Sequence, residues 1–251
     1  MECSSVWDRH IWGWQMKKKT ISLTRAGAII VALIIICSSA LIGENGKEYY
    51  SPTPQILGDI SKYSGQPYVV INDNNPGFLE KELTTKSYEE YSQLDGMGRC
   101  GVAEACIGID LMPTEVREDI SNVEPTGWIN QEYEIVEGGY LYNRCHLIGF
   151  QLSGENANER NLITGTRYMN TEGMLPFENI VADYVKDTGN HVMYRVTPIF
   201  EGSNLVASGV QIEAESVEDN GEGIQYNVYV YNVQPGITID YATGDNWIES
   251  K

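Results

Sequence analysis

The segment between residues 140 and 185 constrains the fold of this chain more than any other part. Tyr140–Gly149 has the composition of a strand, Asn156–Asn161 is a polar loop, and Leu162–Ile163 is a short apolar run. Pro176 fits the first turn of a helix that continues through Phe177–Val185. A strand, a loop, a second short strand and a helix in this order predict a ββα unit inside a mixed domain.

Other segments have strand character or turn chemistry. Tyr68–Ile71 predicts a strand, and Asn72–Gly77 predicts a turn, because asparagine, proline and glycine favour turn conformations. Three runs nearer the C-terminus predict strands at His191–Phe200, Leu205–Ala214 and Tyr226–Val233. We therefore expect an α+β fold with a mixed, mainly antiparallel central sheet and flanking helices.

The remaining segments are less regular. Ser87–Tyr91 fits either a short helix or a strand, and Leu94–Asp110 is rich in glycine. Pro113–Glu118 predicts the opening of a short helix, since proline is favoured near a helix start. Thr166–Asn170 predicts another helix start, and Gly173 is expected to end that helix.

The N-terminal segment has the features of an export signal. Lysines at positions 17–19 and Arg25 precede an apolar run that, taken as Ala26–Ile42, has 17 residues. This reaches the lower limit of about 17 residues for a helix that crosses a bilayer. The segment predicts either a cleaved signal peptide or a retained anchor, with the lysines on the cytoplasmic side and the rest of the chain outside.

The domain organisation follows from this segment. Residues 1–43 form the predicted signal or membrane anchor, residues 44–67 a linker, and residues 68–251 the folded domain. We expect this domain at the outer face of the cell membrane or in the medium. Met16, followed by three lysines, has the character of a natural translation start, and we hypothesise that the true start lies there. N-terminal sequencing of an unprocessed product that retains Met1 would contradict this hypothesis.

Three of the five cysteines, Cys100, Cys106 and Cys145, follow the export segment. Export permits a disulfide between Cys100 and Cys106, and three unpaired thiols are an equal alternative. The odd count leaves at least one thiol free or paired between chains. A structural zinc site is not expected, because the chain has no Cys-x-x-Cys pair.

The exported part is strongly acidic. Residues 44–251 carry 12 basic and 33 acidic side chains, a balance of −21. Nucleic-acid binders generally present a basic surface instead. Five of the 12 basic residues lie between positions 144 and 195, so we expect a local positive cleft on an acidic body. Such a body would bind a polyanion loosely and release it, which suits an enzyme that turns over.

Four polar residues in and after the predicted ββα strand form a chemically coherent set. Arg144 and His146 lie in the strand, Asn170 lies 24 residues beyond the histidine, and Glu178 eight further on. Histidine accepts protons near neutral pH, and an amide oxygen can anchor a hydrated Mg²⁺ ion. Phosphodiester hydrolysis needs a base for the attacking water and positive charge for the phosphate and the leaving oxygen.

The residues around this set resemble a known family. Residues 140–150 read Tyr-Leu-Tyr-Asn-Arg-Cys-His-Leu-Ile-Gly-Phe, and residues 155–170 read Glu-Asn-Ala-Asn-Glu-Arg-Asn-Leu-Ile-Thr-Gly-Thr-Arg-Tyr-Met-Asn. Both resemble the DNA/RNA non-specific endonucleases, in particular the membrane-associated DNA-entry nucleases of Gram-positive bacteria. The resemblance covers residues 65–245 and is strongest at 140–200. It implies a ββα-metal (His-Me finger) motif.

The resemblance also implies an activity and a role for each residue. The expected enzyme is a Mg²⁺-dependent endonuclease, with Mn²⁺ as a substitute, that cuts DNA without sequence specificity; RNA is left open as a second substrate. His146 matches the general base, Arg144 a phosphate-binding arginine and Asn170 the metal-binding asparagine. Glu178 matches the carboxylate that orients metal-bound water. The uses implied by the family are DNA uptake, destruction of extracellular DNA and nucleotide scavenging.

Two positions depart from the family motif. Asn143 replaces its aspartate and Cys145 its glycine, and we interpret both as variation beside the histidine. Arg160, Arg167 and Asn161 are further candidates for substrate binding. The alternatives are that Asn161 only shapes the loop and that Arg160 and Arg167 are solvated surface charges.

Each site residue also has a structural alternative. His146 would serve as a core histidine in a strand, and Arg144 as an exposed charge. Asn170 would serve as a helix C-cap, because asparagine tolerates the left-handed conformation. Glu178 would favour the first turn of a helix through the helix dipole alone.

Three other functions compete with a nuclease. One is a catalytically silent DNA-binding or receptor module on the same fold. Another is a Cys/His hydrolase that uses Cys145, although adjacent residues of a strand point to opposite faces. The third is a toxin delivered to competitors, which would usually need an additional domain.

Overall fold

The computed structural model of the chain describes residues 60–249. The predicted export segment and the greater part of the predicted linker lie outside the described residues. The chain divides into two units, residues 1–48 and 49–251, and every described residue belongs to the second unit. Within residues 60–249, no helix is long and apolar enough to span a membrane.

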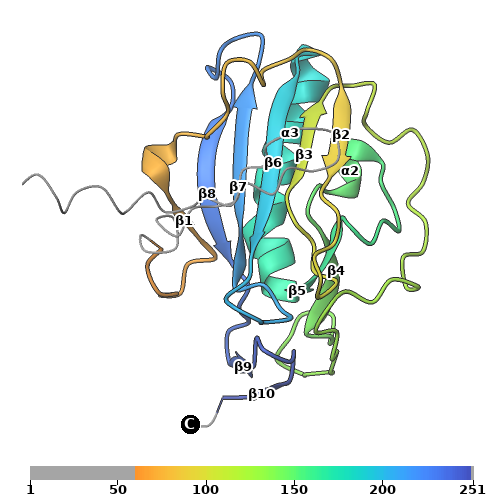
Figure 1. Cartoon of the computed structure of the whole chain (residues 1–251), viewed down its shortest axis with the longest axis vertical. Helices are drawn as coiled ribbons and strands as arrows, with labels where there is room; N and C mark the ends of the chain where they lie inside the picture. The colour runs from red at the N-terminus through yellow and green to blue at the C-terminus, as the bar shows by residue number, and fades with distance from the viewer. Residues whose placement is uncertain (1–59, 250–251) are drawn as a thin grey trace, which may run out of the picture. The chain divides into compact units, whose positions relative to one another are not determined.

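A six-stranded antiparallel sheet organises the domain (Figure 1). The strand order is β1-β8-β7-β6-β3-β2, and every neighbouring pair is antiparallel. Its strands are β1 (Tyr68–Val70), β2 (Tyr88–Tyr91), β3 (Ala103–Ile107), β6 (Val192–Ile199), β7 (Gly209–Ser216) and β8 (Gln225–Tyr231). The predicted α+β class with a mainly antiparallel sheet is therefore confirmed. Strand β3 was hidden by the glycine-rich composition of its surroundings.

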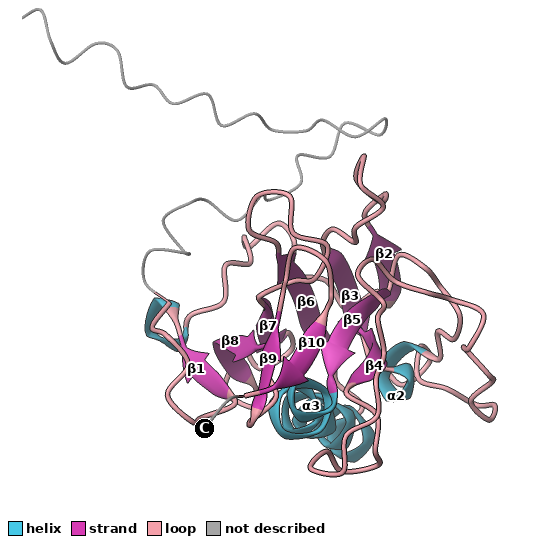
Figure 2. Ribbon diagram, turned by 90° about the horizontal axis from the view of Figure 1, so that it is seen from below, coloured by secondary structure: helices cyan, strands magenta, loops and turns pink. Residues whose placement is uncertain are grey.

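The predicted ββα unit is present at one end of this sheet. Strand β4 (Tyr142–His146) pairs with β5 (Leu162–Thr166), and the short helix α2 (Phe150–Ser153) lies in their connection. A π-helical turn, η2 (Met169–Met174), then leads directly into α3 (Leu175–Thr188). Both ribbon views place α3 along one face of the large sheet (Figures 1 and 2).

The main hydrophobic core fills the space between α3 and that face. Val181 and Val185 of α3 are fully buried in one cluster with Tyr194 of β6 and Ile212 of β7. The residue between each pair of core positions points to the opposite face, since side chains alternate along a strand. Burial of the α3 stripe fixes the helix, and with it the position of the first helical turn beside β4.

The other face of the sheet carries a buried ion-pair cluster. Arg195 Nε donates to Glu213 Oε2 at 2.9 Å, and its NH1 lies 3.3 Å from Glu104 Oε2. The guanidinium also stacks over Phe78 at 4.5 Å. The expectation that Arg195 adds to a positive cleft near the motif is therefore wrong, because β6 turns this side chain away from α3 and into carboxylates.

Two predictions about helices are also wrong. Pro113–Glu118 does not form a helix and is irregular. Its backbone forms a hydrogen bond outside the segment, because the Glu118 N–H donates to Asn156 Oδ1 at 2.9 Å. Gly173 does not end a helix, since η2 continues through it into α3. The glycine instead lets this turn approach β8, where a Cβ atom would collide with Val230.

The described residues contain three cysteines, and all three are buried and free. Cys100 lies before β3 and contacts the Leu162 carbonyl at 3.2 Å, whereas Cys106 lies within β3 and contacts the Thr84 carbonyl at 3.0 Å. Of the two alternatives for Cys100 and Cys106, the structure has the unpaired one.

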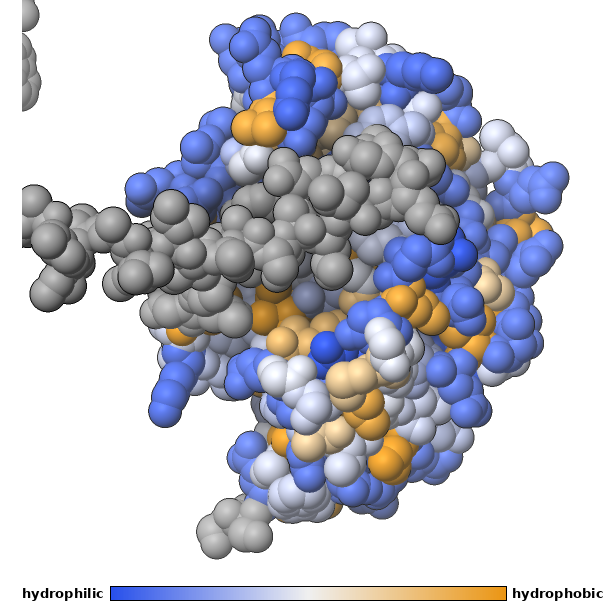
Figure 3. Space-filling model, viewed as in Figure 1, coloured by the Kyte–Doolittle hydropathy of each residue, from blue (hydrophilic) through white to orange (hydrophobic). Residues whose placement is uncertain are grey.

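Two small elements complete the domain. The 3-10 turn η1 (Asn72–Asn74) occupies the predicted turn after β1, and strands β9 (Ile237–Ile239) and β10 (Asn246–Ile248) form a C-terminal hairpin that the sequence did not predict. Charged and polar residues dominate the uncovered surface in Figure 3, with apolar patches scattered among them.

Candidate active site

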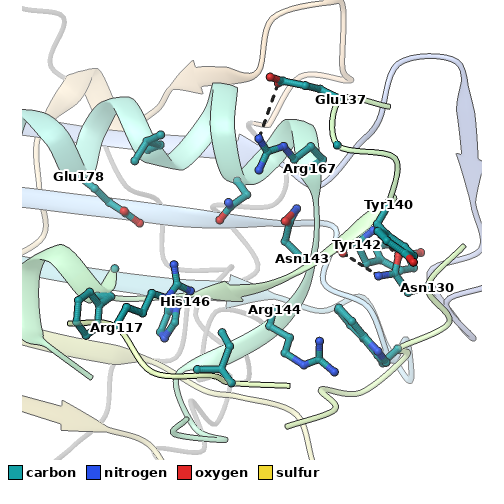
Figure 4. Close-up of a pocket in the computed structure, with 17 residues that line it drawn as sticks. Arg117, Asn130, Glu137, Tyr140, Tyr142, Asn143, Arg144, His146, Arg167 and Glu178 are labelled. Carbon is teal, nitrogen blue, oxygen red and sulfur yellow. Dashed lines mark hydrogen bonds and ion pairs between the residues drawn. The ribbon is translucent and has the colours of Figure 1, made fainter. Parts of the chain in front are cut away.

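A cleft of about 730 Å³ opens beside β4, the loop after it, η2 and the first turn of α3 (Figure 4). Arg144, His146, Asn170 and Glu178, predicted from positions up to 34 apart, all line it. The other lining residues come from the segments before β4, from β4 itself, from the start of α2, from the end of β5 and from the start of α3: Arg117, Ile120, Trp128, Asn130, Glu137, Gly138, Tyr140, Tyr142, Asn143, Gly149, Phe150, Arg167 and Leu175.

His146 ends strand β4 and is only 6% exposed. Its Nε2 lies 2.9 Å from the Asn156 carbonyl oxygen, which can only accept, so Nε2 carries the hydrogen and Nδ1 the lone pair. Burial, and more weakly the charge of Arg117, lower the pKa of His146 to about 4, against an opposing contribution from the Asn156 hydrogen bond. The imidazole is therefore neutral at pH 7 and able to accept a proton at Nδ1.

Arg117 lies in the cleft beside His146, and the sequence did not predict it there. Its NH2 donates toward Nδ1 of His146 at 3.3 Å, and its charge also lowers the pKa of Glu178. The residue lies in an irregular segment 29 positions before the histidine, without a local pattern around it. The one available signal was the scarcity of basic residues in such an acidic chain.

Glu178 lies in the first turn of α3 and is 9% exposed. Burial is the main cause that raises its pKa to about 7, while a hydrogen bond with Gln151 and the charge of Arg117 act in the opposite direction. The backbone of Gly149 lies so close that a Cβ there would collide with the carboxylate. A buried carboxylate with a raised pKa is a group that a bound cation would stabilise in its ionised form.

Asn170 lies in η2, and its Oδ1 accepts a hydrogen bond from the Cys145 thiol at 3.0 Å. A carbonyl oxygen has two lone pairs, so one stays available to a metal ion. The C-cap alternative for Asn170 is wrong, because the helical stretch continues for 18 residues beyond it, to Thr188.

Arg144 is held at the cleft by its own chain. Its NH2 donates to the Ser121 carbonyl at 2.8 Å, its Nε donates to the Val123 carbonyl, and its guanidinium stacks over Trp128 at 4.4 Å. The predicted alternative of a freely exposed charge is therefore wrong. These contacts orient the guanidinium and leave part of its donor set for a ligand.

The three further candidates for substrate binding separate in the structure. Arg167 lines the cleft, where it lies 3.9 Å from Glu137, whereas Arg160 is not among the lining residues. Asn161 is fully buried, accepts from the Ile148 N–H at 2.9 Å and donates to the Ile148 carbonyl at 3.0 Å. The prediction that Asn161 contacts substrate is corrected: its amide braces the loop between β4 and β5.

Cys145 faces away from its neighbour. Its side chain is fully buried, and its thiol contacts Asn170 and the sulfur of Met174, the latter at 3.5 Å. Burial raises the pKa of this thiol strongly. A Cys/His nucleophile would need a thiolate that faces the imidazole, so the alternative hydrolase has no geometric support.

The donor set fits a hydrated divalent ion better than a fully ligated one. Among residues 60–249, no group of three or more His, Cys, Asp or Glu side chains could hold a metal. Asn170 and Glu178 offer oxygen ligands at the same cleft, and Mg²⁺ commonly keeps several waters beside one or two protein oxygens.

A ββα unit with a histidine, an asparagine and a glutamate at one cleft defines a class of metal-dependent nuclease folds. The family model for the DNA/RNA non-specific endonucleases matches residues 80–218, which is more than half of the chain. The chain belongs to this family. The predicted family is thereby confirmed.

Solved structures support the same placement. The crystal structure of NucA from Streptococcus agalactiae with a magnesium ion bound has 25% sequence identity and a TM-score of 0.67; the match covers 78% of this chain and 93% of that chain. The structure of Sda1 nuclease with a bound zinc ion has 28% identity and a TM-score of 0.63, over 74% of this chain and 97% of that one.

A protein relative points to the same group. A deoxyribonuclease from Streptococcus dysgalactiae subsp. equisimilis is 26% identical, over 69% of this chain and 64% of its own length. The chain thus spans somewhat less than two thirds of this relative.

Proposed function

We propose that this protein is an exported endonuclease that hydrolyses phosphodiester bonds of DNA, and of RNA as a second substrate, with a divalent metal ion. The observation that carries the proposal is a neutral His146 whose Nδ1 faces a cleft shared with Asn170 and Glu178. Family membership supplies the reaction class.

His146 would act as the general base. The Asn156 carbonyl fixes the tautomer and would stabilise the imidazolium that forms when Nδ1 takes a proton from water. Arg117 would withdraw toward the phosphate when substrate binds, because a phosphate oxygen is a stronger partner for a guanidinium than a neutral imidazole is.

Asn170 would hold the metal ion, which we propose is Mg²⁺, with Mn²⁺ as a substitute, and Glu178 would orient water bound to that ion. The ion supplies positive charge for the phosphate and the leaving oxygen. Glu178 would have to be ionised for this role, and with a pKa of about 7 it depends on the nearby cation to favour its ionised form. The NucA and Sda1 structures, with their magnesium and zinc ions, support a divalent metal.

Arg117, Arg144 and Arg167 would contact backbone phosphates. All three line the cleft, and guanidinium groups bind phosphate oxygens in a bidentate manner. Backbone contacts position a nucleic acid without reading its bases, which accounts for a lack of sequence specificity. The N-terminal lysines and apolar run support export and membrane attachment, with the domain outside the cell.

Digestion of plasmid DNA and of RNA by the purified full-length chain tests the proposal, with Mg²⁺, Mn²⁺ or EDTA. Cutting that needs the metal and is lost in His146→Ala, with partial rescue by imidazole, is the expected result. His191→Ala is the matched control, since this histidine does not line the cleft. DNA binding without cutting by the wild-type protein would overturn the proposal in favour of a silent receptor module.

A further inference from the structure

One end of the cleft is aromatic. Figure 4 shows Tyr140 and Tyr142 beside Asn130, at the end away from His146 and Glu178. Tyr142 is 2% exposed, and its hydroxyl donates to the Gly244 carbonyl at 3.0 Å. Its ring is therefore structural and cannot take a ligand.

Tyr140 differs from the other aromatic residues of this wall in its exposure. Trp128 already has the Arg144 guanidinium 4.4 Å from its ring centre and Tyr142 packed at 6.3 Å. Tyr140 is 52% exposed, more than any other large aromatic side chain within residues 60–249. A broad apolar ring thus faces water at the lip of the catalytic cleft.

The backbone holds Tyr140 firmly despite this exposure. The residue forms a β-bridge with Glu132, and the next residue, Leu141, is fully buried and donates to the Gln131 carbonyl at 3.0 Å. A hydrogen bond between the Tyr140 hydroxyl and Glu132 raises the pKa of that hydroxyl and orients the ring. A fixed ring loses little conformational freedom when a ligand packs on it.

The charge of the cleft predicts weak electrostatic binding of nucleic acid, so contact with an aromatic ring would add needed affinity. Three arginines and two glutamates line it, and the surrounding domain is acidic, so release of counterions from a bound strand contributes little affinity. Stacking of bases on aromatic rings adds affinity that tolerates any sequence, because every base has a π-face. Bases inside a duplex are already stacked and paired, whereas an unpaired base is free to stack on protein.

We propose that Tyr140 is a stacking subsite for an unpaired nucleobase of the strand being cut, so that single-stranded nucleic acid is the preferred substrate. This inference rests on the proposed nuclease function and adds its substrate class. Tyr140 would contribute to substrate binding and not to the chemical step, since it lies at the other end of the cleft from His146 (Figure 4).

The test combines substrates with and without bases. The substrates are a short single-stranded DNA, the same strand with consecutive abasic tetrahydrofuran residues, and the matching duplex. The proteins are the full-length wild type, Tyr140→Ala, Tyr140→Phe and Trp247→Ala. Trp247 is a matched control because it is 48% exposed but does not line the cleft.

Tyr140→Ala should raise KM for the normal single strand about tenfold and leave kcat nearly unchanged. The abasic strand and the duplex should not distinguish this variant from the wild type. Tyr140→Phe keeps the ring but loses the hydrogen bond to Glu132, so its KM should lie closer to that of the wild type than to that of Tyr140→Ala. Trp247→Ala should behave as the wild type. An equal effect of Tyr140→Ala on the normal and abasic strands, or no effect on either, would overturn the subsite.

Failure of the nuclease function itself would be visible separately, as absence of cutting by the wild type. Fluorescence polarisation of the labelled strands in EDTA would then decide the subsite. Weaker binding by Tyr140→Ala, confined to the strand that carries bases, would support stacking. Equal affinities of the two proteins would overturn it.

Discussion

Two histidines lie within residues 60–249, and their surroundings are opposite. His146 is buried, with a backbone carbonyl on Nε2 and the Arg117 guanidinium beside Nδ1. His191, just before β6, has its Nδ1 2.6 Å from Glu218 Oε1, and its backbone N–H donates to Glu218 Oε2 at 2.8 Å. Burial and the nearby Arg117 charge favour the neutral form of His146, and the Asn156 carbonyl opposes them more weakly. Of these two histidines, only His146 lines the cleft, where its Nδ1 can accept a proton from water.

The largest expected effect comes from removing the buried ring. His146→Ala should reduce the rate of DNA cutting by about 10³-fold, within the range for the loss of a general base. His191→Ala should stay within about twofold of wild type, because its ring lies outside the cleft. Initial rates of plasmid nicking measure both. Comparable losses of rate in the two variants would show that the two histidines do not differ in their contribution to cutting.

A smaller effect should follow from removing Arg117, the cation beside His146. Arg117 lowers the pKa of both His146 and Glu178, so Arg117→Ala should raise both pKa values and move the acid limb of kcat/KM to higher pH. The rate at pH 7 should fall about 10- to 100-fold through the lost phosphate contact. Rates between pH 4 and pH 8 measure the shift.

Arg117→Lys and Arg160→Ala are the controls for this pH profile. The lysine keeps the positive charge, so the acid limb should not move. It lacks the planar guanidinium that binds phosphate in a bidentate manner, so the rate should fall. Arg160 does not line the cleft, so its removal should change neither property. An acid limb that stays in place in Arg117→Ala would show that this charge sets the pKa of neither His146 nor Glu178.

A few-fold change in metal affinity is expected from removing the Cys145 thiol, which contacts Asn170. The Cys145 thiol donates to Asn170 Oδ1, so Cys145→Ala should weaken Mn²⁺ binding about threefold, and Cys145→Ser should restore a donor. Met174→Leu, a volume-conserving change on the other side of the thiol, is the packing control. Electron paramagnetic resonance of Mn²⁺ without nucleic acid measures each affinity. Equal weakening in all three variants would indicate packing alone.

The smallest effect concerns the second histidine and stability. The pKa of Glu218 is lowered: burial opposes the shift, and the hydrogen bonds and charge of His191 cause it. A carboxylate with a lowered folded pKa stabilises the fold above its unfolded pKa of about 4.3, and this contribution disappears as pH falls through the folded value. Glu218→Gln should lower the melting temperature by about 1–2 °C at pH 7, and this loss should shrink as the pH falls through the lowered pKa of Glu218. Scanning calorimetry along a pH series from neutral to strongly acidic measures the change; a loss that is the same at every pH would contradict the ion pair.

Local pattern predicted most of the regular structure. The long strands β6, β7 and β8 and the helix α3 follow from alternation and from Pro176 at the helix start. Gly173 failed as a helix stop, because its propensity was overridden by the close approach to Val230. The irregular conformation of Pro113–Glu118 could not be predicted either, since its hydrogen-bond partner Asn156 lies outside the segment.

The sequence by itself determined the chemical set: His146, Asn170 and Glu178 at a spacing that a strand, a loop and a helix impose. Only the tertiary structure decided the state of these groups. The pKa of His146 depends on burial and on Arg117, which arrives from another segment, and the pKa of Glu178 depends on its burial against Gly149. Hydration and through-space charge are set by distant parts of the chain, so local sequence cannot contain them.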